Sequence, residues 1–274
     1  DETYYKILVP EKNSKGKGVR KGYLWVVVGI NTRMIYLLYD DGSRSEKVIL
    51  NELGGCKGII QSDGYSPYRK LESDAYPHIT RIPCLQHIKR KFIDCGEDEP
   101  DAKRIVELIN TLYQNEHKHK IGVDGWTVEQ NLVHRKKYAP DILGEIKDVL
   151  DDIEERGDLL PKSELKEAVT YLRNEWNAVV DIFNYGDTYL DNNIVERMNR
   201  YISLSRKNSL FFGSHKGAER GAILYTIALT CRMHKVNLFE YLTDVINRTA
   251  EWQPNTPLEK YRELLPDRWE KANG

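Results

Sequence analysis

The sequence predicts a mixed α/β fold that carries an all-helical insertion. Three observations indicate this. The first third of the 274-residue chain alternates short apolar, β-branched runs with helical segments, the middle third shows only helical spacing of apolar residues, and further helical patterns continue towards the C-terminus. With 40% hydrophobic residues, the chain can bury a core of ordinary size.

Strands are expected first. Tyr5, Ile7 and Val9 alternate with other residues, as in a half-buried strand. Residues 23–30 are continuously apolar, which suits a strand covered on both faces. Residues 33–39 follow a short Asn-Thr turn, so the two segments should form a hairpin.

Helices and strands then alternate. Ser45 should cap a helix that runs to Leu53 and stops at two glycines. A short buried strand (58–62), a second strand (78–82) and a basic amphipathic helix (84–95) follow. An RNase H-like fold requires this order of elements: three strands, helix, strand, helix, strand, helix. In that fold, three antiparallel strands lead into a parallel βαβ portion.

The remainder is expected to be helical. Apolar residues recur at helical spacing over 101–184, where Ser163 starts one helix, and Asp191 can cap the next. Beyond a basic loop, helices are expected over 218–234 and 238–249. We therefore predict three parts: the first part of an RNase H-like core (1–96), a helical insertion (97–187), and a core helix with the basic loop and C-terminal helices (188–274).

Charge is segregated along the chain although the net charge is only −1. Residues 97–187 contain 12 Lys or Arg and 21 Asp or Glu, which gives a net charge of −9. Residues 194–235 contain eight Lys or Arg and two Asp or Glu, which gives a net charge of +6. A basic segment of this kind can neutralise several phosphates of a nucleic acid. Solvated helix faces explain the same charges equally well.

Cysteine usage favours a reducing compartment, because the four cysteines include no C-x-x-C pair. No apolar run approaches the ~20 residues that a membrane helix needs, and no signal peptide is found, so we expect a cytoplasmic protein without a membrane partner. Cys84 and His87 have C-x-x-H spacing, but structural zinc needs four ligands and no second pair accompanies them. A buried Cys and a hydrogen-bonded His are therefore the favoured interpretation.

Acidic residues offer candidates for phosphodiester chemistry, in which two divalent ions ~3.5–4 Å apart are held by converging carboxylates. Asp63 follows an apolar strand, at the end where open α/β sheets bind ligands, although an Asp-Gly turn is the ordinary alternative. Glu196 lies on a helix whose polar face also carries Asn192, Asn199, Arg200 and Ser203. A helix ion pair is the simpler alternative for Glu196. Asp1 carries no meaning as an isolated terminal acid.

Together these segments resemble the insertion sequence 66 family of DDE transposases. The matching motifs, in order, are DET (1–3), GYLWV (22–26), QSDGY (61–65), CLQHIKRKF (84–92), DNNIVERMNR (191–200) and SRKNSLFFGSHKGAERGAILY (205–225). Each motif is weak alone, but the ordered set is specific. The resemblance runs from the first residue to Leu264-Leu265-Pro266 and Trp269, nearly the whole chain.

The resemblance implies a bacterial mobile-element enzyme that cleaves DNA and transfers the strand during recombination. It implies that Asp1, Asp63 and Glu196 are the catalytic acids and bind two Mg²⁺ (or Mn²⁺) ions. A metal-activated water would free a 3′-hydroxyl at the element end, and that hydroxyl would attack the target strand. Joining two ends requires a homo-oligomer on the DNA, in the bacterial nucleoid.

Further residues are assigned around these acids. We expect DNA contacts from Arg90, Lys91, Arg200, Arg206, Lys207, Asn208 and Lys216, mainly to backbone phosphates. Support for the active site is expected from Cys84, His87, Asn192 and Arg197.

Three departures from the family pattern stand out. Many relatives have Trp where Leu85 stands, and Arg-Pro where Arg200-Tyr201 stands. The upstream region for end recognition and multimerisation is also missing, so we expect this chain to be a shortened catalytic part. Two alternatives remain: an RNase H-like nuclease that hydrolyses without strand transfer, and a DNA-binding derivative that has lost catalysis. The second is disfavoured because all three acids are present.

Overall fold

The computed structural model describes residues 1–12, 16, 18–157 and 159–270. By their contacts these residues form two compact units. The sheet unit comprises residues 1–48 and 193–274, and the helical unit comprises residues 49–192. The predicted division into three parts (1–96, 97–187 and 188–274) was drawn from sequence pattern and expected chemistry, whereas the two units are defined by contacts. The three-part division therefore stays a prediction.

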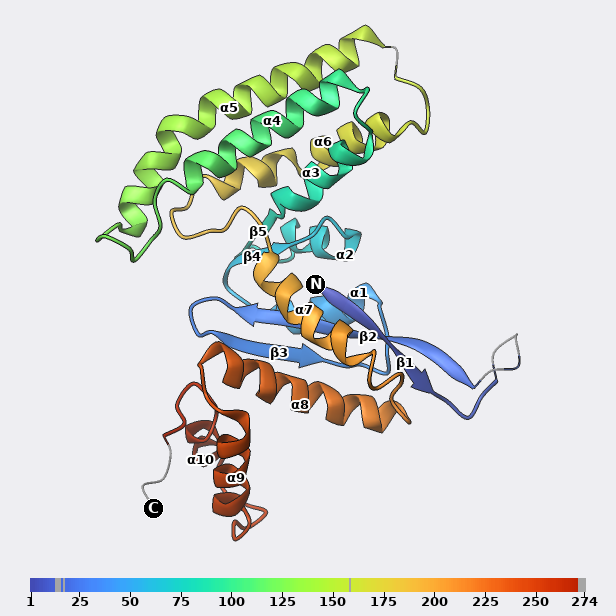
Figure 1. The fold of residues 1–274 in the computed structure, drawn as a ribbon, viewed down its shortest axis with the longest axis vertical. Helices are drawn as coiled ribbons and strands as arrows, with labels where there is room; N and C mark the ends of the chain where they lie inside the picture. The colour runs from blue at the N-terminus through green and yellow to red at the C-terminus, as the bar shows by residue number, and fades with distance from the viewer. Residues whose placement is uncertain (13–15, 17, 158, 271–274) are drawn as a thin grey trace. The chain divides into compact units, whose positions relative to one another are not determined.

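The sheet unit contains an antiparallel sheet in the order β1 (Glu2–Leu8), β2 (Val19–Gly29) and β3 (Met34–Leu38), shown in Figure 1. The predicted first strand and hairpin are thus confirmed. Three consecutive residues of β2, Leu24 to Val26, are buried. Because neighbouring side chains of a strand point to opposite faces, both faces of the sheet are covered there, as the continuous apolar run predicted.

Two helices pack on this sheet, α7 (Asn193–Ser205) and α8 (His215–Met233). Side chains from one face of β1, Tyr5 and Ile7, share a buried cluster with Met198 and Ile202 of α7. Thr230 of α8 binds β3 directly, since its Oγ1 accepts from Ile35 N at 3.1 Å and donates to Ile35 O at 3.2 Å. Helix α8 therefore satisfies the backbone groups of an edge strand. The chain continues into α9 (Leu238–Thr249), as predicted, and α10 (Leu258–Glu263), which was not predicted.

The helical unit contains a smaller, parallel sheet of β4 (Gly58–Ser62) and β5 (Ile79–Pro83). Helix α1 (Glu46–Leu53) precedes β4, the short helices α2 (Ser66–Arg69) and η1 (Lys70–Glu72) lie between the strands, and α3 (Leu85–Asp94) follows β5. The order of elements matches the prediction. The expectation that 58–62 is buried is wrong for its first half, because Gly58 and Ile59 are exposed and only Ser62 is fully buried.

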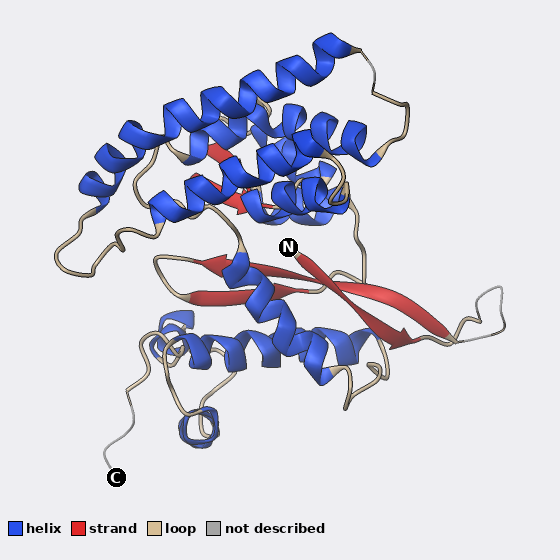
Figure 2. Cartoon of the chain, turned by 45° about the horizontal axis from the view of Figure 1, so that its top comes forward, coloured by secondary structure: helices blue, strands red, loops and turns tan. Residues whose placement is uncertain are grey.

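Three long helices complete this unit: α4 (Pro100–Glu116), α5 (Val128–Arg156) and α6 (Glu164–Ile182), drawn in Figure 2. Ser163 caps α6, as predicted, because its Oγ accepts from Lys166 N at 3.2 Å. One apolar core joins α3 to the three long helices. Its fully buried members include Ile88, Ile105, Leu150 and Val169, one from each helix.

The chain is therefore a mixed α/β protein with an all-helical portion. The described strands form two sheets, so their hydrogen bonds do not build the single mixed sheet expected of an RNase H-like fold. The predicted βαβ order is present, but no ladder joins β1 to β4 in the described chain. None of the described helices is long and apolar enough to cross a bilayer.

Candidate active site

Asp1 is held in place by the first strand pair. Its carbonyl oxygen accepts from Val26 N at 2.8 Å, which extends the β1–β2 ladder to this residue. Its carboxylate accepts two further hydrogen bonds, from Glu2 N to Oδ1 at 2.7 Å and from Asn199 Nδ2 to Oδ2 at 2.9 Å. The second bond directs the Asp1 carboxylate to helix α7, which carries Glu196.

Glu196 lies on the same face of α7 as Asn199, one turn earlier. Residues three apart on a helix have β-carbons about 5–6 Å apart. The opposite, apolar face of the helix is buried on the sheet through Val195, Met198 and Ile202. The sheet unit therefore brings Asp1 beside the polar face that presents Glu196, two acids that are 195 positions apart in the chain.

Asp63 belongs to the helical unit and follows the last residue of β4. Its Oδ1 accepts from Tyr65 N at 3.0 Å, so the side chain closes a local turn of the kind that Asp-Gly predicts. Gly64 N donates to the Tyr171 hydroxyl at 2.9 Å. A β-carbon at residue 64 would lie 2.1 Å from that oxygen, so only glycine fits beside Tyr171.

Arg81 holds the backbone of this turn in place through a hydrogen bond. It is only 2% exposed and donates from Nε to Ser62 Oγ at 3.0 Å and from Nη2 to the Asp63 carbonyl oxygen at 2.8 Å. Its Nη1 pairs with Glu175 of α6 at 2.7 Å and with Glu72 at 2.5 Å. The strand end that carries Asp63 is thereby attached to a helix of the insertion.

Burial shapes the ionisation of this network. Burial raises the pKa of Glu175, although the Arg81 guanidinium beside it acts in the opposite direction. Burial also raises the pKa of Tyr171 to about 12, and the nearby Glu175 and Asp63 carboxylates add to that effect. Tyr171 is therefore a neutral hydroxyl at physiological pH. Its oxygen accepts from Gly64 N.

Arg81, Tyr171 and Glu175 were not predicted as site residues. The available signal was an arginine inside the short apolar strand ITRIP, where a charge must find a partner. The identity of that partner depends on a contact 94 positions away, and sequence spacing does not encode it.

The predicted DNA-binding residues of the sheet unit differ in how they are held. Arg200, Lys207, Asn208 and Lys216 are exposed. Arg206, in contrast, lies against β1: its Nη1 donates to Thr3 Oγ1 at 3.0 Å and to the Tyr4 carbonyl oxygen, and its guanidinium carbon is 4.3 Å from the Tyr4 ring centroid. These contacts anchor the basic loop to the strand, and the contact of Arg206 with DNA stays a prediction.

In the helical unit, Arg90 and Lys91 are exposed on α3, with Lys91 Nζ 5.5 Å from the Tyr171 ring centroid. Cys84 is 1% exposed, and burial raises the pKa of its thiol to about 11. His87 is half-buried in the first turn of α3.

The two remaining supporting residues lie at the start of α7. Arg197 is exposed, and Asn192 is buried at 2% exposure. The Asn192 side chain makes no hydrogen bond with the described residues.

The donor set of this site suits a hard cation. Asp1 and Glu196 provide carboxylate oxygens, and Asn199 Oδ1 is buried without a hydrogen-bond donor in the described chain. Mg²⁺ and Mn²⁺ prefer such oxygen ligands, whereas zinc prefers sulfur and nitrogen. Across the described residues, no group of three or more His, Cys, Asp or Glu side chains is gathered closely enough to hold a metal ion.

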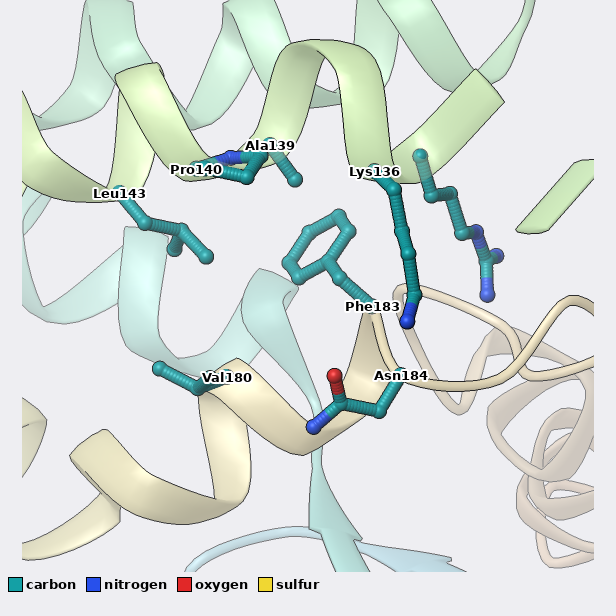
Figure 3. Close-up of a pocket in the computed structure, with 8 residues that line it drawn as sticks. Lys136, Ala139, Pro140, Leu143, Val180, Phe183 and Asn184 are labelled. Carbon is teal, nitrogen blue, oxygen red and sulfur yellow. The ribbon is translucent and has the colours of Figure 1, made fainter. Parts of the chain in front are cut away.

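A pocket of about 400 Å³ lies elsewhere in the helical unit, between α5 and α6 (Figure 3). Its walls are mainly apolar, and its polar members are basic or neutral: it is lined by Arg135, Lys136, Ala139, Pro140, Leu143, Val180, Phe183 and Asn184. Its lining contains no carboxylate or histidine, so it lacks the metal ligands that phosphodiester chemistry requires.

Within the sheet unit, the start of β1 and helix α7 thus bring oxygen donors together, and in the helical unit Asp63 follows a strand. The profile of the family described as "Transposase IS66 family" matches residues 1–220, and the chain belongs to that family.

Three uncharacterised proteins of Sinorhizobium fredii (strain NBRC 101917 / NGR234) are similar to it. Proteins y4jD, y4hP and y4qI are each 28% identical, over 234, 254 and 274 residues, covering 83%, 86% and 94% of this chain. The matched regions are 44%, 44% and 49% of those proteins. This chain therefore spans less than half the length of the curated relatives it matches.

Proposed function

We propose that this chain is the catalytic part of a DDE transposase with an RNase H-like core, in which Asp1, Asp63 and Glu196 hold two divalent ions, Mg²⁺ or Mn²⁺. Membership of the transposase family supports the activity. The observation that carries the site is the hydrogen bond from Asn199 to Asp1, because it joins the first acid to the helix of the third.

The remaining residues would keep the acids in position. When bound, the two ions would activate the attacking oxygen and stabilise the leaving one. Asn199 orients Asp1, while Arg81 and Tyr171 hold the turn of Asp63. Hydrolysis at the element end would release a 3′-hydroxyl, which would then attack a target phosphodiester.

DNA would be bound through exposed basic side chains. In the sheet unit, Arg200, Lys207 and Lys216 are exposed and suited to phosphate contacts, as is Arg90 in the helical unit. Element ends and target DNA would be the partners of the protein, in the bacterial nucleoid. The protein would act as a homo-oligomer on DNA, because strand transfer joins two ends.

A cleavage assay tests this proposal. A labelled duplex with the terminal sequence of the encoding element is incubated with the protein and Mg²⁺. Asp63→Asn and Glu196→Gln should each lower cleavage by at least about 100-fold while DNA affinity is retained, because removing a metal ligand removes a transition-state interaction. Glu219→Gln, an exposed acid on α8, is the matched control and should cleave normally. Normal cleavage by either site variant would refute the assignment.

The same assay distinguishes the alternatives. Joined strand-transfer products identify a transposase, whereas cleavage without joining identifies a nuclease. Binding without metal-dependent nicking would identify a DNA-binding derivative.

A further inference from the structure

The three long helices of the helical unit form a bundle with two well-defined ends. At one end, the last turn of α4 meets the start of α5, where Glu116 pairs with Arg135. At the other end, the first turn of α4 meets the end of α5, where Asp101 pairs with Arg156. Helices α4 and α5 are therefore antiparallel.

Helix α6 shares the same two ends. Arg135 Nη1 also donates to the carbonyl oxygen of Ile182, the last residue of α6, at 3.2 Å. At the middle of α6, Arg173 pairs with Asp151 and with Glu154 of α5. The end of α6 thus lies beside the start of α5, and its middle pairs with the last turns of α5.

The two ends differ in charge. Residues 113–140 and 176–187, which form the first end, contain five Lys or Arg and five Asp or Glu, together with three histidines, so this end carries no net charge. Residues 141–167, which lead to the second end, contain four Lys or Arg and ten Asp or Glu. Residues 97–107, at the same end, contain a further two Lys or Arg and five Asp or Glu. The strongly negative charge of the insertion is thus confined to one end of the bundle.

Four lysines of the first end, Lys118, Lys120, Lys136 and Lys137, are exposed, and none has a carboxylate within ion-pair distance among the described residues. We call these residues the lysine end. Figure 3 shows the Lys136 side chain beside the α5–α6 pocket, which it helps to line. Lysines without carboxylate partners can form ion pairs with an external anion.

The adjoining loop is ordered by its own aromatic contacts. The rings of His119 and Trp126 stack with centroids 3.8 Å apart and an interplanar angle of 11°. His134 of α5 packs edge-on against His119 at 5.2 Å. These contacts hold the segment that carries Lys118 and Lys120 against α5, so less conformational entropy is lost when an anion binds.

We propose that the lysine end binds the phosphate backbone of double-stranded DNA, while the acidic end is repelled by it. This inference depends on the proposed function in one respect, because the proposed function identifies the bound polyanion as DNA. Lysines that neutralise phosphates release condensed counterions, which favours binding irrespective of sequence. The opposite charge at the far end of the bundle would prevent the insertion from lying along DNA in the reverse direction.

The lysine end is too far from Asp63 to take part in the chemistry. Tyr171, whose hydroxyl accepts from Gly64, and Ile182, which accepts from Arg135, are both on α6. Between these two residues the helix axis rises about 16 Å, at about 1.5 Å per residue. That rise equals about five base pairs of B-DNA. The lysines would therefore bind DNA that flanks the cleavage site, as positioning residues.

The test compares two pairs of lysine substitutions in the 274-residue chain. The first variant is Lys136→Gln with Lys137→Gln at the lysine end. The matched control is Lys103→Gln with Lys166→Gln, two exposed lysines of the same bundle near its acidic end. Each removes two positive charges, so only the location differs. Affinity for a fluorescent duplex of arbitrary sequence is measured by anisotropy at several salt concentrations.

We expect the lysine-end variant to bind about tenfold or more weakly at 0.1 M salt, with a slope of log affinity against log salt that is shallower by about 1 to 2. The control should bind within about twofold of the parent, with the parent slope. Equal loss in both variants, or no loss in either, overturns the inference, and circular dichroism confirms that each variant is folded.

The outcome separates this inference from the proposed function. If the parent binds and cleaves DNA and the lysine-end variant binds like the parent, the inference fails and the function stands. If the parent binds no DNA, both fail.

Discussion

Arg81 is the residue on which the position of Asp63 depends most. Its guanidinium is buried against Glu175, which is 1% exposed, and also bonds the Asp63 carbonyl oxygen. Arg81→Met should reduce the free energy of unfolding by about 3–5 kcal/mol, because it removes the nearest charged partner of a buried carboxylate and leaves only Arg69, whose Nε lies 3.8 Å from Glu175. Urea denaturation measures the change.

A double variant provides the control for Arg81. Glu175→Leu combined with Arg81→Met removes both charges of the buried pair and should recover part of the lost stability, since the partners that remain, Glu72 and Arg69, are partly exposed to water. Equal stability of Arg81→Met and the parent would show that the pair does not support this turn.

Gly64 is the second residue with a strict steric requirement. Gly64→Ala should destabilise the protein by about 1–3 kcal/mol and impair cleavage, because the new methyl group overlaps the Tyr171 hydroxyl and displaces the Asp63 turn. Gly55→Ala is the matched control, since a β-carbon there meets nothing within 4 Å. Urea unfolding and the cleavage rate are the measurements, and similar behaviour of both variants would contradict the steric account.

Cys84 should be chemically inert in the folded protein. Burial raises its thiol pKa to about 11, so at pH 8 the reactive thiolate is scarce, and the side chain is also inaccessible. Cys56 is exposed and serves as the internal control. Timed alkylation with iodoacetamide, followed by peptide mass spectrometry, should label Cys56 long before Cys84. Labelling of both at similar rates would show that Cys84 is accessible.

Among the elements, β3 is bonded to β2 along one edge and depends on helix α8 for hydrogen bonds along its other edge. Thr230 is 1% exposed and bonds both the N–H and the C=O of Ile35. Thr230→Val preserves the shape but leaves those two groups unpaired, so we expect a loss of about 1–3 kcal/mol in the free energy of unfolding. Thr243→Val on α9, where the threonine is exposed, should have little effect. Comparable losses would show that α8 contributes packing alone.

Most elements could be predicted because their signals are local. Alternation at Tyr5 and Ile7, the apolar run of β2 and the cap at Ser163 each depend on a few neighbouring residues. The arrangement of strands into two sheets depends on pairing between distant segments, and the short α10 has too few residues for a periodic pattern. These features could not be read from local periodicity.

The candidate site shows the same limit at the residue level. Asp63 and Glu196 were candidates from their positions after a strand and on a helix, and the resemblance assigned both of them, together with Asp1, as the catalytic acids. Asn199 was placed on the correct helical face, but its bond to Asp1 was not foreseen. Nor was the network from Arg81 to Glu175, because its partners come from α6, far along the chain.

At the scale of the whole molecule, charge and chemistry are distributed over both compact units. The sheet unit carries Asp1, Glu196 and the basic loop, and the helical unit carries Asp63 and the lysine end. Under the proposed function, the acids would serve phosphoryl transfer and the cations would bind a polyanion. The proposed function requires acids from both units to share bound metal, and this is its central proposal.

Iron-directed cleavage of the protein tests that claim most directly. Fe²⁺ replaces Mg²⁺, and ascorbate with peroxide generates hydroxyl radicals at the bound metal. The account predicts backbone cuts near residue 63 and near residue 196, both suppressed by excess Mg²⁺ and both lost in Asp63→Ala. Cuts near residue 196 that persist unchanged in Asp63→Ala would contradict a shared metal site.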